Sequence, residues 1–212
     1  MHIAVLMLAL MTIATSASAQ AQPAAKPIKL VVLGDSLSAG LGLPAQEAFP
    51  AKLQKALRAK GIDIDMVNAG VSGDTSSGGR DRLDWSVAEG TEGVIVELGA
   101  NDGLRGLPVA QMKENLTAVV RAAQRARAKV LLIGMRLPPN YGRPYIDEFR
   151  RAFQEVAGER NIALVPFLLE GMADKPNLFQ ADNLHPVAEA QPVLLENVWR
   201  GLAPLLAKPA GR

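Results

Sequence analysis

Cysteine is absent from the 212-residue sequence, and histidine occurs only twice, at His2 and His185. The lack of cysteine excludes disulfide bonds, cysteine-ligated zinc or iron–sulfur sites and a thiol nucleophile. An excess of one charge is lacking too, because 23 Lys and Arg residues nearly balance 21 Asp and Glu residues. The formal net charge of +2, without a basic run, predicts no nucleic-acid partner. The length, with 49% hydrophobic and 21% charged residues, is typical of a folded domain with a sizeable core.

The amino-terminal segment resembles a secretory signal peptide in composition. Residues 3–15 form an apolar run followed by small residues of the A-x-A type, which predicts cleavage after Ala19. The run is shorter than the roughly 18–20 apolar residues that span a bilayer, which disfavours the alternative of an uncleaved membrane anchor. We therefore expect residues 1–19 to be a cleaved signal peptide, 20–27 a flexible tail, 28–207 the folded domain and 208–212 a carboxyl-terminal tail. Such a protein is exported, to the periplasm, and has no stable membrane insertion after cleavage. The mature chain then keeps His185 as its single imidazole, which excludes a multi-histidine metal site.

Strand-like and helix-like segments alternate along the domain. Short apolar, β-branched runs predict strands at residues 28–33, 62–67, 94–98, 130–133 and 162–165. Helical spacing of apolar residues predicts helices at about 46–60, 76–88, 108–126, 144–159 and 186–206, the last one interrupted near Pro192. This alternation predicts an α/β fold with three layers, in which helices cover both faces of a five-stranded parallel sheet.

Parallel strands place every loop that follows a strand at the same edge of the sheet, where ligands bind. Ser36 follows the first strand, and its hydroxyl needs an adjacent base to become a nucleophile. His185 is the only candidate base, and Asp182 lies three residues before it, close enough to orient the imidazole. The backbone N–H groups of Ser36 and Gly73 and the amide of Asn101 are candidate donors to a developing oxyanion. Three further carboxylates on these loops are interpreted as residues that brace them: Asp35, Asp74 and Asp102.

Each of these residues taken singly has an ordinary explanation as a helix cap, a turn former or a position with positive φ. Their gathering at one edge favours a catalytic site. The segment 40–45 matches the dinucleotide pattern G-x-G-x-x-A, but it begins six residues after the strand ends at Gly34, and Asn68 stands where an acid is expected. A G-x-S-x-G elbow, which is usual in lipase-type α/β-hydrolases, is also missing.

Four blocks of sequence together resemble those of the SGNH, or GDSL-type, hydrolases: residues 34–38 with Ser36, the glycine Gly73, residues 99–102 with Asn101, and residues 182–186 with Asp182 and His185. Segments 68–75, 96–106 and 136–142 are similar to the bacterial thioesterase I/lysophospholipase/arylesterase branch. The resemblance implies a flavodoxin-like strand order of 2-1-3-4-5 and an exported enzyme without a cofactor. It implies Ser36 as nucleophile, His185 as base, Asp182 as its partner, and Ser36, Gly73 and Asn101 as the oxyanion hole. It also implies a mobile, substrate-responsive segment at residues 103–108.

The expected activity is hydrolysis of esters and thioesters, namely acyl-CoA-like thioesters, lysophospholipids, and aryl and short-chain esters. We expect a small-molecule substrate and a monomeric enzyme. The acyl chain is expected to contact five apolar residues of the edge loops: Leu37, Leu104, Leu107, Pro138 and Leu184. Two alternatives stay open. One is a carbohydrate or peptidoglycan O-deacetylase, which the 4% aromatic content disfavours, and the other is a periplasmic binding module that uses the same cleft.

Overall fold

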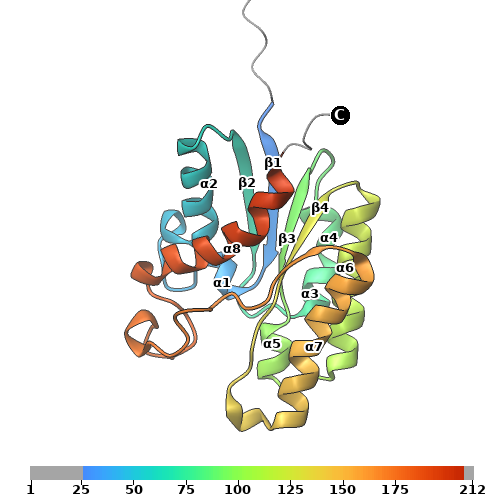
Figure 1. The fold of residues 1–212 in the computed structure, drawn as a ribbon, viewed down its shortest axis with the longest axis vertical. Helices are drawn as coiled ribbons and strands as arrows, with labels where there is room; N and C mark the ends of the chain where they lie inside the picture. The colour runs from blue at the N-terminus through green and yellow to red at the C-terminus, as the bar shows by residue number, and fades with distance from the viewer. Residues whose placement is uncertain (1–25, 208–212) are drawn as a thin grey trace, which may run out of the picture.

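The computed structural model describes residues 26–207 and contains one five-stranded sheet. Its strands are β1 (Ile28–Gly34), β2 (Ile64–Gly70), β3 (Gly93–Glu97), β4 (Lys129–Ile133) and β5 (Ala163–Val165). They pair in the order β2-β1-β3-β4-β5, and every pair is parallel (Figure 1). The predicted α/β class and the strand order implied by the family resemblance are both confirmed.

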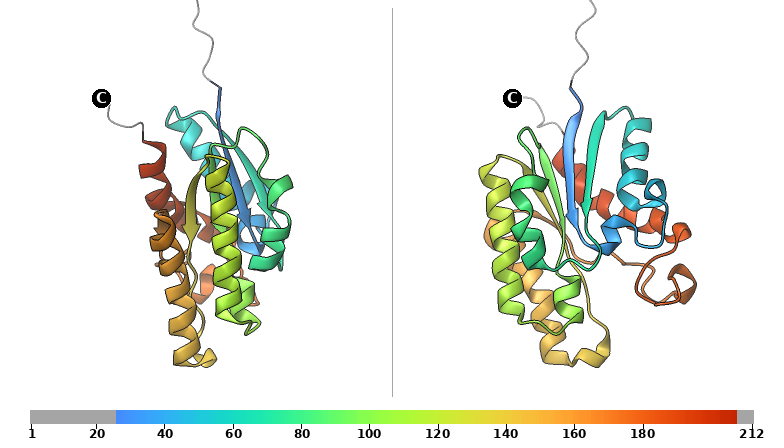
Figure 2. Two further views of the ribbon diagram at one scale, coloured as in Figure 1. Left: turned by 90° about the vertical axis from the view of Figure 1, so that its right-hand side faces the viewer. Right: turned by 180° about the vertical axis from the view of Figure 1, so that it is seen from behind.

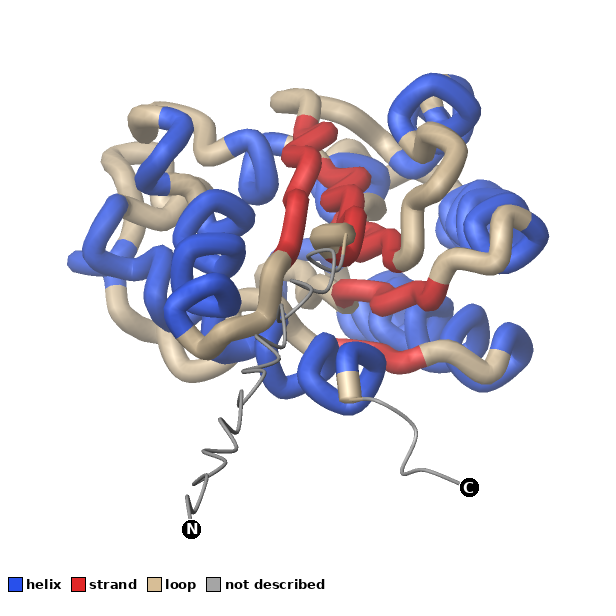
Figure 3. Tube along the Cα trace, turned by 90° about the horizontal axis from the view of Figure 1, so that it is seen from above, coloured by secondary structure: helices blue, strands red, loops and turns tan. Residues whose placement is uncertain are grey.

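Helices cover both faces of this sheet. They are α1 (Ser36–Ala39), α2 (Phe49–Ala59), α3 (Ser76–Asp81), α4 (Leu83–Ser86), α5 (Ala100–Leu104), α6 (Val109–Arg125), α7 (Arg143–Arg160) and α8 (Gln191–Leu206). Helices α2 and α8 pack against each other on one face, and α6 packs between α3 and α7 on the other (Figures 1 and 2). Seen along the sheet in Figure 3, the strands form a middle layer between two layers of helices.

The core follows from the composition of the central strands. All five residues of β3 and the last five of β1 are buried, as expected for strands that are covered on both faces. Phe149 and Phe153 of α7 are buried and pack edge to face, with ring centroids 5.2 Å apart. This packing makes the sheet a rigid support for the loops at its carboxyl edge, which is the lower edge in Figure 1.

Several element boundaries differ from the predictions. The second strand is displaced to residues 64–70, because hydrogen bonding to β1 continues through Gly70, where the local sequence has little strand propensity. The segment 76–88 forms two helices separated at Arg82, whose guanidinium donates to the carbonyls of Gly34 and Ala69. The last helix begins at Gln191 and is not broken at Pro192, because proline is tolerated in the first turn. The short helix α5 was not predicted.

The predicted signal peptide, most of the amino-terminal tail and the carboxyl-terminal tail lie outside the described residues. Among residues 26–207, no helix has both the length and the apolar character that crossing a membrane requires.

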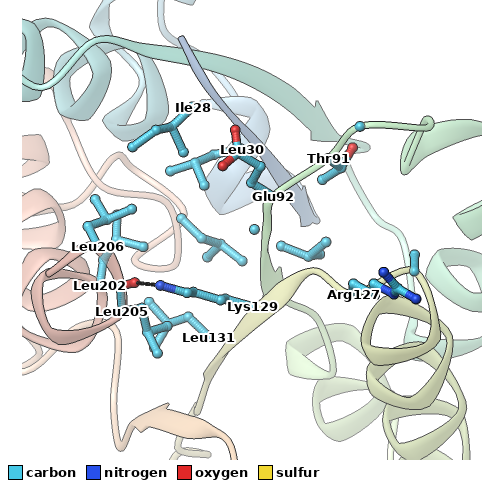
Figure 4. Close-up of a pocket in the computed structure, with 15 residues that line it drawn as sticks. Ile28, Leu30, Thr91, Glu92, Arg127, Lys129, Leu131, Leu202, Leu205 and Leu206 are labelled. Carbon is cyan, nitrogen blue, oxygen red and sulfur yellow. Dashed lines mark hydrogen bonds between the residues drawn. The ribbon is translucent and has the colours of Figure 1, made fainter. Parts of the chain in front are cut away.

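A cavity of about 360 Å³ lies at the amino-terminal edge of the sheet. Ile28, Leu30, Leu202 and Leu206 line its apolar wall, and Lys129 donates a hydrogen bond to the carbonyl of Leu205 (Figure 4). Ser36, Gly73, Asn101 and His185 line instead a different and larger cavity of about 630 Å³ at the carboxyl edge.

Candidate active site

Ser36 is the first residue of α1 and directly follows the β1 strand end and Asp35. The carboxylate of Asp35 caps this short helix by accepting the backbone N–H of Leu37 at 3.0 Å. Ser36 is itself largely buried, but it lines the larger cavity. The turn therefore holds the hydroxyl at the carboxyl edge of a central strand.

The imidazole of His185 joins Ser36 to Asp182. Its Nε2 lies 2.8 Å from Ser36 Oγ, and its Nδ1 lies 2.6 Å from Asp182 Oδ2. Because Asp182 accepts at Nδ1, a neutral imidazole carries its proton there and leaves Nε2 free to accept the hydroxyl proton. The structure thus brings together the serine of one predicted loop and the aspartate and histidine of another.

Backbone groups hold the Asp182 carboxylate in place. Its Oδ1 accepts the N–H of His185 at 3.0 Å and that of Leu184 at 2.9 Å. The N–H of His185, the imidazole of His185 and the N–H of Leu184 together lower the pKa of Asp182 to about 2. Asn183 between them adopts a positive φ of 58°, which an asparagine tolerates better than most residues. The Asp182 carboxylate is therefore ionised at neutral pH.

Two of the candidate oxyanion donors are backbone N–H groups without a protein acceptor. As the first residue of α1, Ser36 has no acceptor for its N–H inside the helix. Gly73 has a φ of 81°, and its N–H makes no hydrogen bond with any other described residue. The Arg105 guanidinium donates to the carbonyl of Gly73 at 2.7 Å and so ties this loop to the end of α5.

The third candidate donor, Asn101, is already engaged. Its Nδ2 donates to Asp35 Oδ2 at 3.1 Å and to the carbonyl of Asp74 at 2.9 Å. These contacts fix the plane of the amide between the β1–α1 turn and the loop after β2. A substrate oxygen that accepts from Asn101 must share or replace one of these two acceptors.

The remaining loop carboxylates brace the site. Asp74 forms a largely buried ion pair with Arg82, with an N–O distance of 2.6 Å. Asp102 accepts both the backbone N–H of Ser76 at 2.7 Å and the Ser76 hydroxyl at 2.5 Å. Both contacts join α3 and the loop before it to the rest of the carboxyl edge, in agreement with the bracing role predicted for them.

The sequence analysis missed Glu97. It is the last residue of β3, it is completely buried, and its Oε2 accepts the backbone N–H of Asp35 at 3.2 Å and the Ser38 hydroxyl at 2.7 Å. An acidic residue at the end of an otherwise apolar buried strand is the signal that could have revealed it.

The larger cavity has an apolar wall beside Ser36. Four of the five predicted acyl-contacting residues line it: Leu37, Leu104, Pro138 and Leu184. Loops after β4 and β5 supply further apolar residues that were not predicted, including Met135, Leu137, Phe167, Leu169 and Phe179.

The prediction for Leu107 is wrong, because this residue does not line the cavity. Its backbone N–H bonds to the carbonyl of Asp102 at 3.0 Å, and its carbonyl accepts the Tyr145 hydroxyl at 2.7 Å. These two bonds direct the segment after α5 toward α7.

Among residues 26–207, no three histidine, aspartate or glutamate side chains lie close enough together to hold a metal ion.

The parallel sheet of this protein is covered by helices on both faces. At its carboxyl edge a serine, an imidazole and a carboxylate are in hydrogen-bond contact. These features place the protein in the class of serine hydrolases. Residues 32–191 match the model of the GDSL-like lipase/acylhydrolase family. The chain belongs to this family, and it is a hydrolase of ester bonds. The family resemblance inferred from the sequence blocks is confirmed, and the alternative of a binding module without activity is set aside.

Similar proteins share most of their length with this chain. It is 51% identical over 178 residues to the esterase TesA of Pseudomonas aeruginosa, covering 84% of this chain and 89% of the relative. It is 39% identical over 178 residues to thioesterase 1/protease 1/lysophospholipase L1 of Escherichia coli strain K12, covering 84% of each chain. A crystal structure of TesA superposes with a TM-score of 0.81 at 50% identity and covers 84% of this chain and 99% of that one.

Proposed function

We propose that the protein hydrolyses acyl esters and thioesters through a covalent acyl-enzyme formed on Ser36. His185 is the general base and acid, and Asp182 orients it. The contact of 2.8 Å between His185 Nε2 and Ser36 Oγ is the observation that carries this proposal. It supplies the adjacent base without which a serine hydroxyl is a poor nucleophile.

In the first half of the reaction, Ser36 Oγ attacks the carbonyl carbon and its proton passes to His185 Nε2. The ionised Asp182 stabilises the resulting imidazolium. The tetrahedral intermediate collapses when the imidazolium protonates the leaving alcohol or thiol. In the second half, water gives a proton to His185 and attacks the acyl-enzyme, which releases the carboxylic acid and restores Ser36.

The proposed oxyanion hole combines the N–H groups of Ser36 and Gly73 with the amide of Asn101. The two backbone N–H groups support this assignment because neither has an acceptor among the described residues. Asn101 contributes when the oxyanion replaces one of its two present acceptors. Each such donor is worth about 3–4 kcal/mol of transition-state stabilisation.

The substrate class follows from the apolar wall of the cavity. Its volume of about 630 Å³ and its leucine, methionine and phenylalanine side chains suit an aliphatic or aryl acyl group. The relatives named esterase and thioesterase/lysophospholipase support a range that includes acyl-CoA-like thioesters and lysophospholipids. Apolar side chains outnumber polar ones in the lining of this cavity, which makes an O-deacetylase the weaker candidate.

Export to the periplasm, with loss of residues 1–19 and no lasting membrane insertion, is part of the proposal. It is supported by the apolar run at residues 3–15 and the small residues before Gln20. We also propose that the mature enzyme acts as a monomer, because Ser36, His185 and Asp182 make their mutual contacts within one chain and need no residue from a second copy.

A fluorophosphonate probe tests the nucleophile. The wild type should be labelled on Ser36 and should turn over p-nitrophenyl esters, whereas Ser36→Ala should lose both properties and keep its circular dichroism spectrum. Ser77→Ala is the matched control, because Ser77 is an exposed serine of α3 and should react like the wild type. Undiminished turnover in Ser36→Ala refutes the proposal.

Two series of substrates with increasing acyl-chain length, p-nitrophenyl esters and CoA thioesters, are compared with acetylated xylan to test the substrate class. We expect hydrolysis of both ester and thioester, with a preference set by the length of the apolar wall. Activity confined to the acetylated sugar contradicts the acyl-chain assignment.

A further inference from the structure

Glu97 lies beneath the proposed catalytic turn and has no contact with solvent. Its Oε2 accepts two hydrogen bonds, one from the backbone N–H of Asp35 at 3.2 Å and one from the Ser38 hydroxyl at 2.7 Å. Its Oε1 is also buried and has no hydrogen-bond donor among the described residues. The two oxygens of this carboxyl group therefore have different surroundings.

An ionised carboxylate is a poor occupant of this position. A buried carboxylate oxygen without a donor costs several kcal/mol, and a second acid, Asp35, stands next to it. Burial raises the pKa of Glu97 well above its usual range, and the neighbouring Asp35 charge raises it further. A proton on Oε1 removes the unpaired acceptor and leaves Oε2 as the acceptor that the structure shows.

Asp35 is in the opposite situation. Its Oδ1 accepts the N–H of Leu37 and its Oδ2 accepts the amide of Asn101, so both oxygens act as acceptors. Burial raises the pKa of Asp35 to about 6, but hydrogen bonds from Leu37, Glu97 and Asn101 and the charge of His185 act against that rise. Of the two acids, Asp35 is the one whose surroundings favour the carboxylate.

We propose that Glu97 is a neutral carboxylic acid at neutral pH and a positioning residue for the oxyanion hole. It accepts the backbone N–H of Asp35 and the Ser38 hydroxyl and so holds the β1–α1 turn in place. Through the Asp35 carboxylate on that turn it sets the plane of the Asn101 amide. The proposal deepens the proposed function, because it rests on Asn101 acting as an oxyanion donor.

The other charged groups around the pair leave this assignment intact. Arg82 approaches the same turn, but its guanidinium is bonded to the carbonyl of Gly34 and to Asp74. Asp102 is bonded to Ser76. His185 acts on Asp35 from the cavity side. A buried ionised carboxylate requires a cationic partner. Among residues 26–207, no cation forms an ion pair with Glu97.

Two substitutions at Glu97 separate the effect of its hydrogen bonds from the effects of its charge and its volume. Glu97→Gln keeps an uncharged side chain of similar shape with an oxygen that accepts from Asp35 N–H and Ser38. Glu97→Met keeps the volume but has no group that replaces these bonds. We expect Glu97→Gln to retain kcat within a factor of about 3, and Glu97→Met to lose about 10- to 100-fold in kcat with little change in KM.

Ile95→Val is the control for general weakening of β3, because Ile95 is a buried apolar residue two positions earlier on the same face of the strand. It should lower the melting temperature without changing kcat. A large loss of kcat in Glu97→Gln, or wild-type kcat in folded Glu97→Met, overturns the proposal.

Isotope-edited infrared spectroscopy of the resting wild-type enzyme reads the proton directly and stays informative if Glu97→Met does not fold. A carbonyl stretch of a buried carboxylic acid should be present at pH 7, should shift when glutamate is labelled with 13C at its side-chain carboxyl, and should be absent from Glu97→Gln. A band that shifts with labelled aspartate instead, or no such band, overturns the assignment. This measurement does not depend on Ser36 chemistry, so a failure of the proposed function, seen as absence of fluorophosphonate labelling, is distinguished from a failure at Glu97.

Discussion

The buried ion pair of Arg82 should contribute far more to the free energy of unfolding than the ion pairs that arginines form on the surface of the helices. Its guanidinium donates to Asp74 Oδ2 at 2.6 Å, to the carbonyl of Gly34 at 2.8 Å and to the carbonyl of Ala69 at 2.5 Å. The side chains of Arg82 and Asp74 are only 11% and 13% exposed. Arg82→Met therefore removes the guanidinium from a mostly buried carboxylate and from two carbonyls.

Breaking a buried pair by removing one partner costs about 3–5 kcal/mol. In a domain of this size that loss lowers the melting temperature by about 6–20 °C. Urea unfolding followed by circular dichroism measures the free energy, and p-nitrophenyl ester turnover measures the effect on the site. Turnover should fall as well, because the carbonyl of Asp74 is one of the two acceptors that hold Asn101.

Arg200→Met is the matched control. Arg200 pairs with Glu196 at 3.2 Å on the surface of α8, where the two side chains are 68% and 53% exposed. Exposed pairs of this kind contribute at most about 1 kcal/mol. If Arg82→Met and Arg200→Met lose the same free energy of unfolding, the bracing role of Arg82 is refuted.

Three further outcomes follow from the same geometry. Asp182→Asn should lower kcat about 10²- to 10⁴-fold in ester turnover without unfolding the protein, and full activity would exclude its orienting role. Because the pKa of Asp182 is held at about 2, chiefly by the backbone N–H of His185, the Asp182 carboxylate should stay ionised as the pH falls toward about 4. The side-chain carboxyl 13C chemical shift of Asp182 in NMR should then be constant between pH 7 and pH 4, and a titration step in that range contradicts this. Ala173→Phe should narrow the cavity and select against long acyl chains in a chain-length series, whereas Leu107→Ala, outside the cavity, should leave the profile unchanged.

Stability should also depend on pH through Asp35. Its pKa is raised to about 6 in the folded protein, above the unfolded value of about 3.9, so between these values the folded state binds more protons than the unfolded state. Its contribution to the free energy of unfolding therefore decreases as the pH rises from about 4 to about 6 and is constant above that window. Urea titrations of the wild type and Asp35→Asn at pH 4 and pH 7 measure the difference, and the opposite trend would refute the argument.

The sequence was informative where local pattern and final structure coincide. The central strands β1, β3 and β4 are apolar runs buried on both faces, and Pro108 marks the start of α6. The predicted parallel topology then placed Ser36 and His185 at one edge of the sheet, although the sequence alone does not show that the two side chains are in contact. The strand order came from the family resemblance, since the alternation of elements does not by itself specify how strands are arranged.

The features that the sequence did not reveal depend on contacts between residues that are far apart along the chain. Glu97 meets Asp35 across 62 positions, and Arg82 meets Gly34 across 48. No local periodicity reports such pairs, so the break between α3 and α4 and the buried acid under the turn were missed. Leu107 was misplaced for the same reason, because its direction is set by the hydroxyl of Tyr145, 38 positions away.

The bond between Ser36 and His185 spans 149 positions, from the first strand to the segment before the last helix. A chain that has not yet docked its final β–α unit carries an inert alcohol, since its only effective base is still far away. The serine thus becomes a nucleophile only once folding has brought His185 into contact with it. In a refolding experiment, the onset of ester turnover should mark the last docking step and should trail the recovery of helical signal.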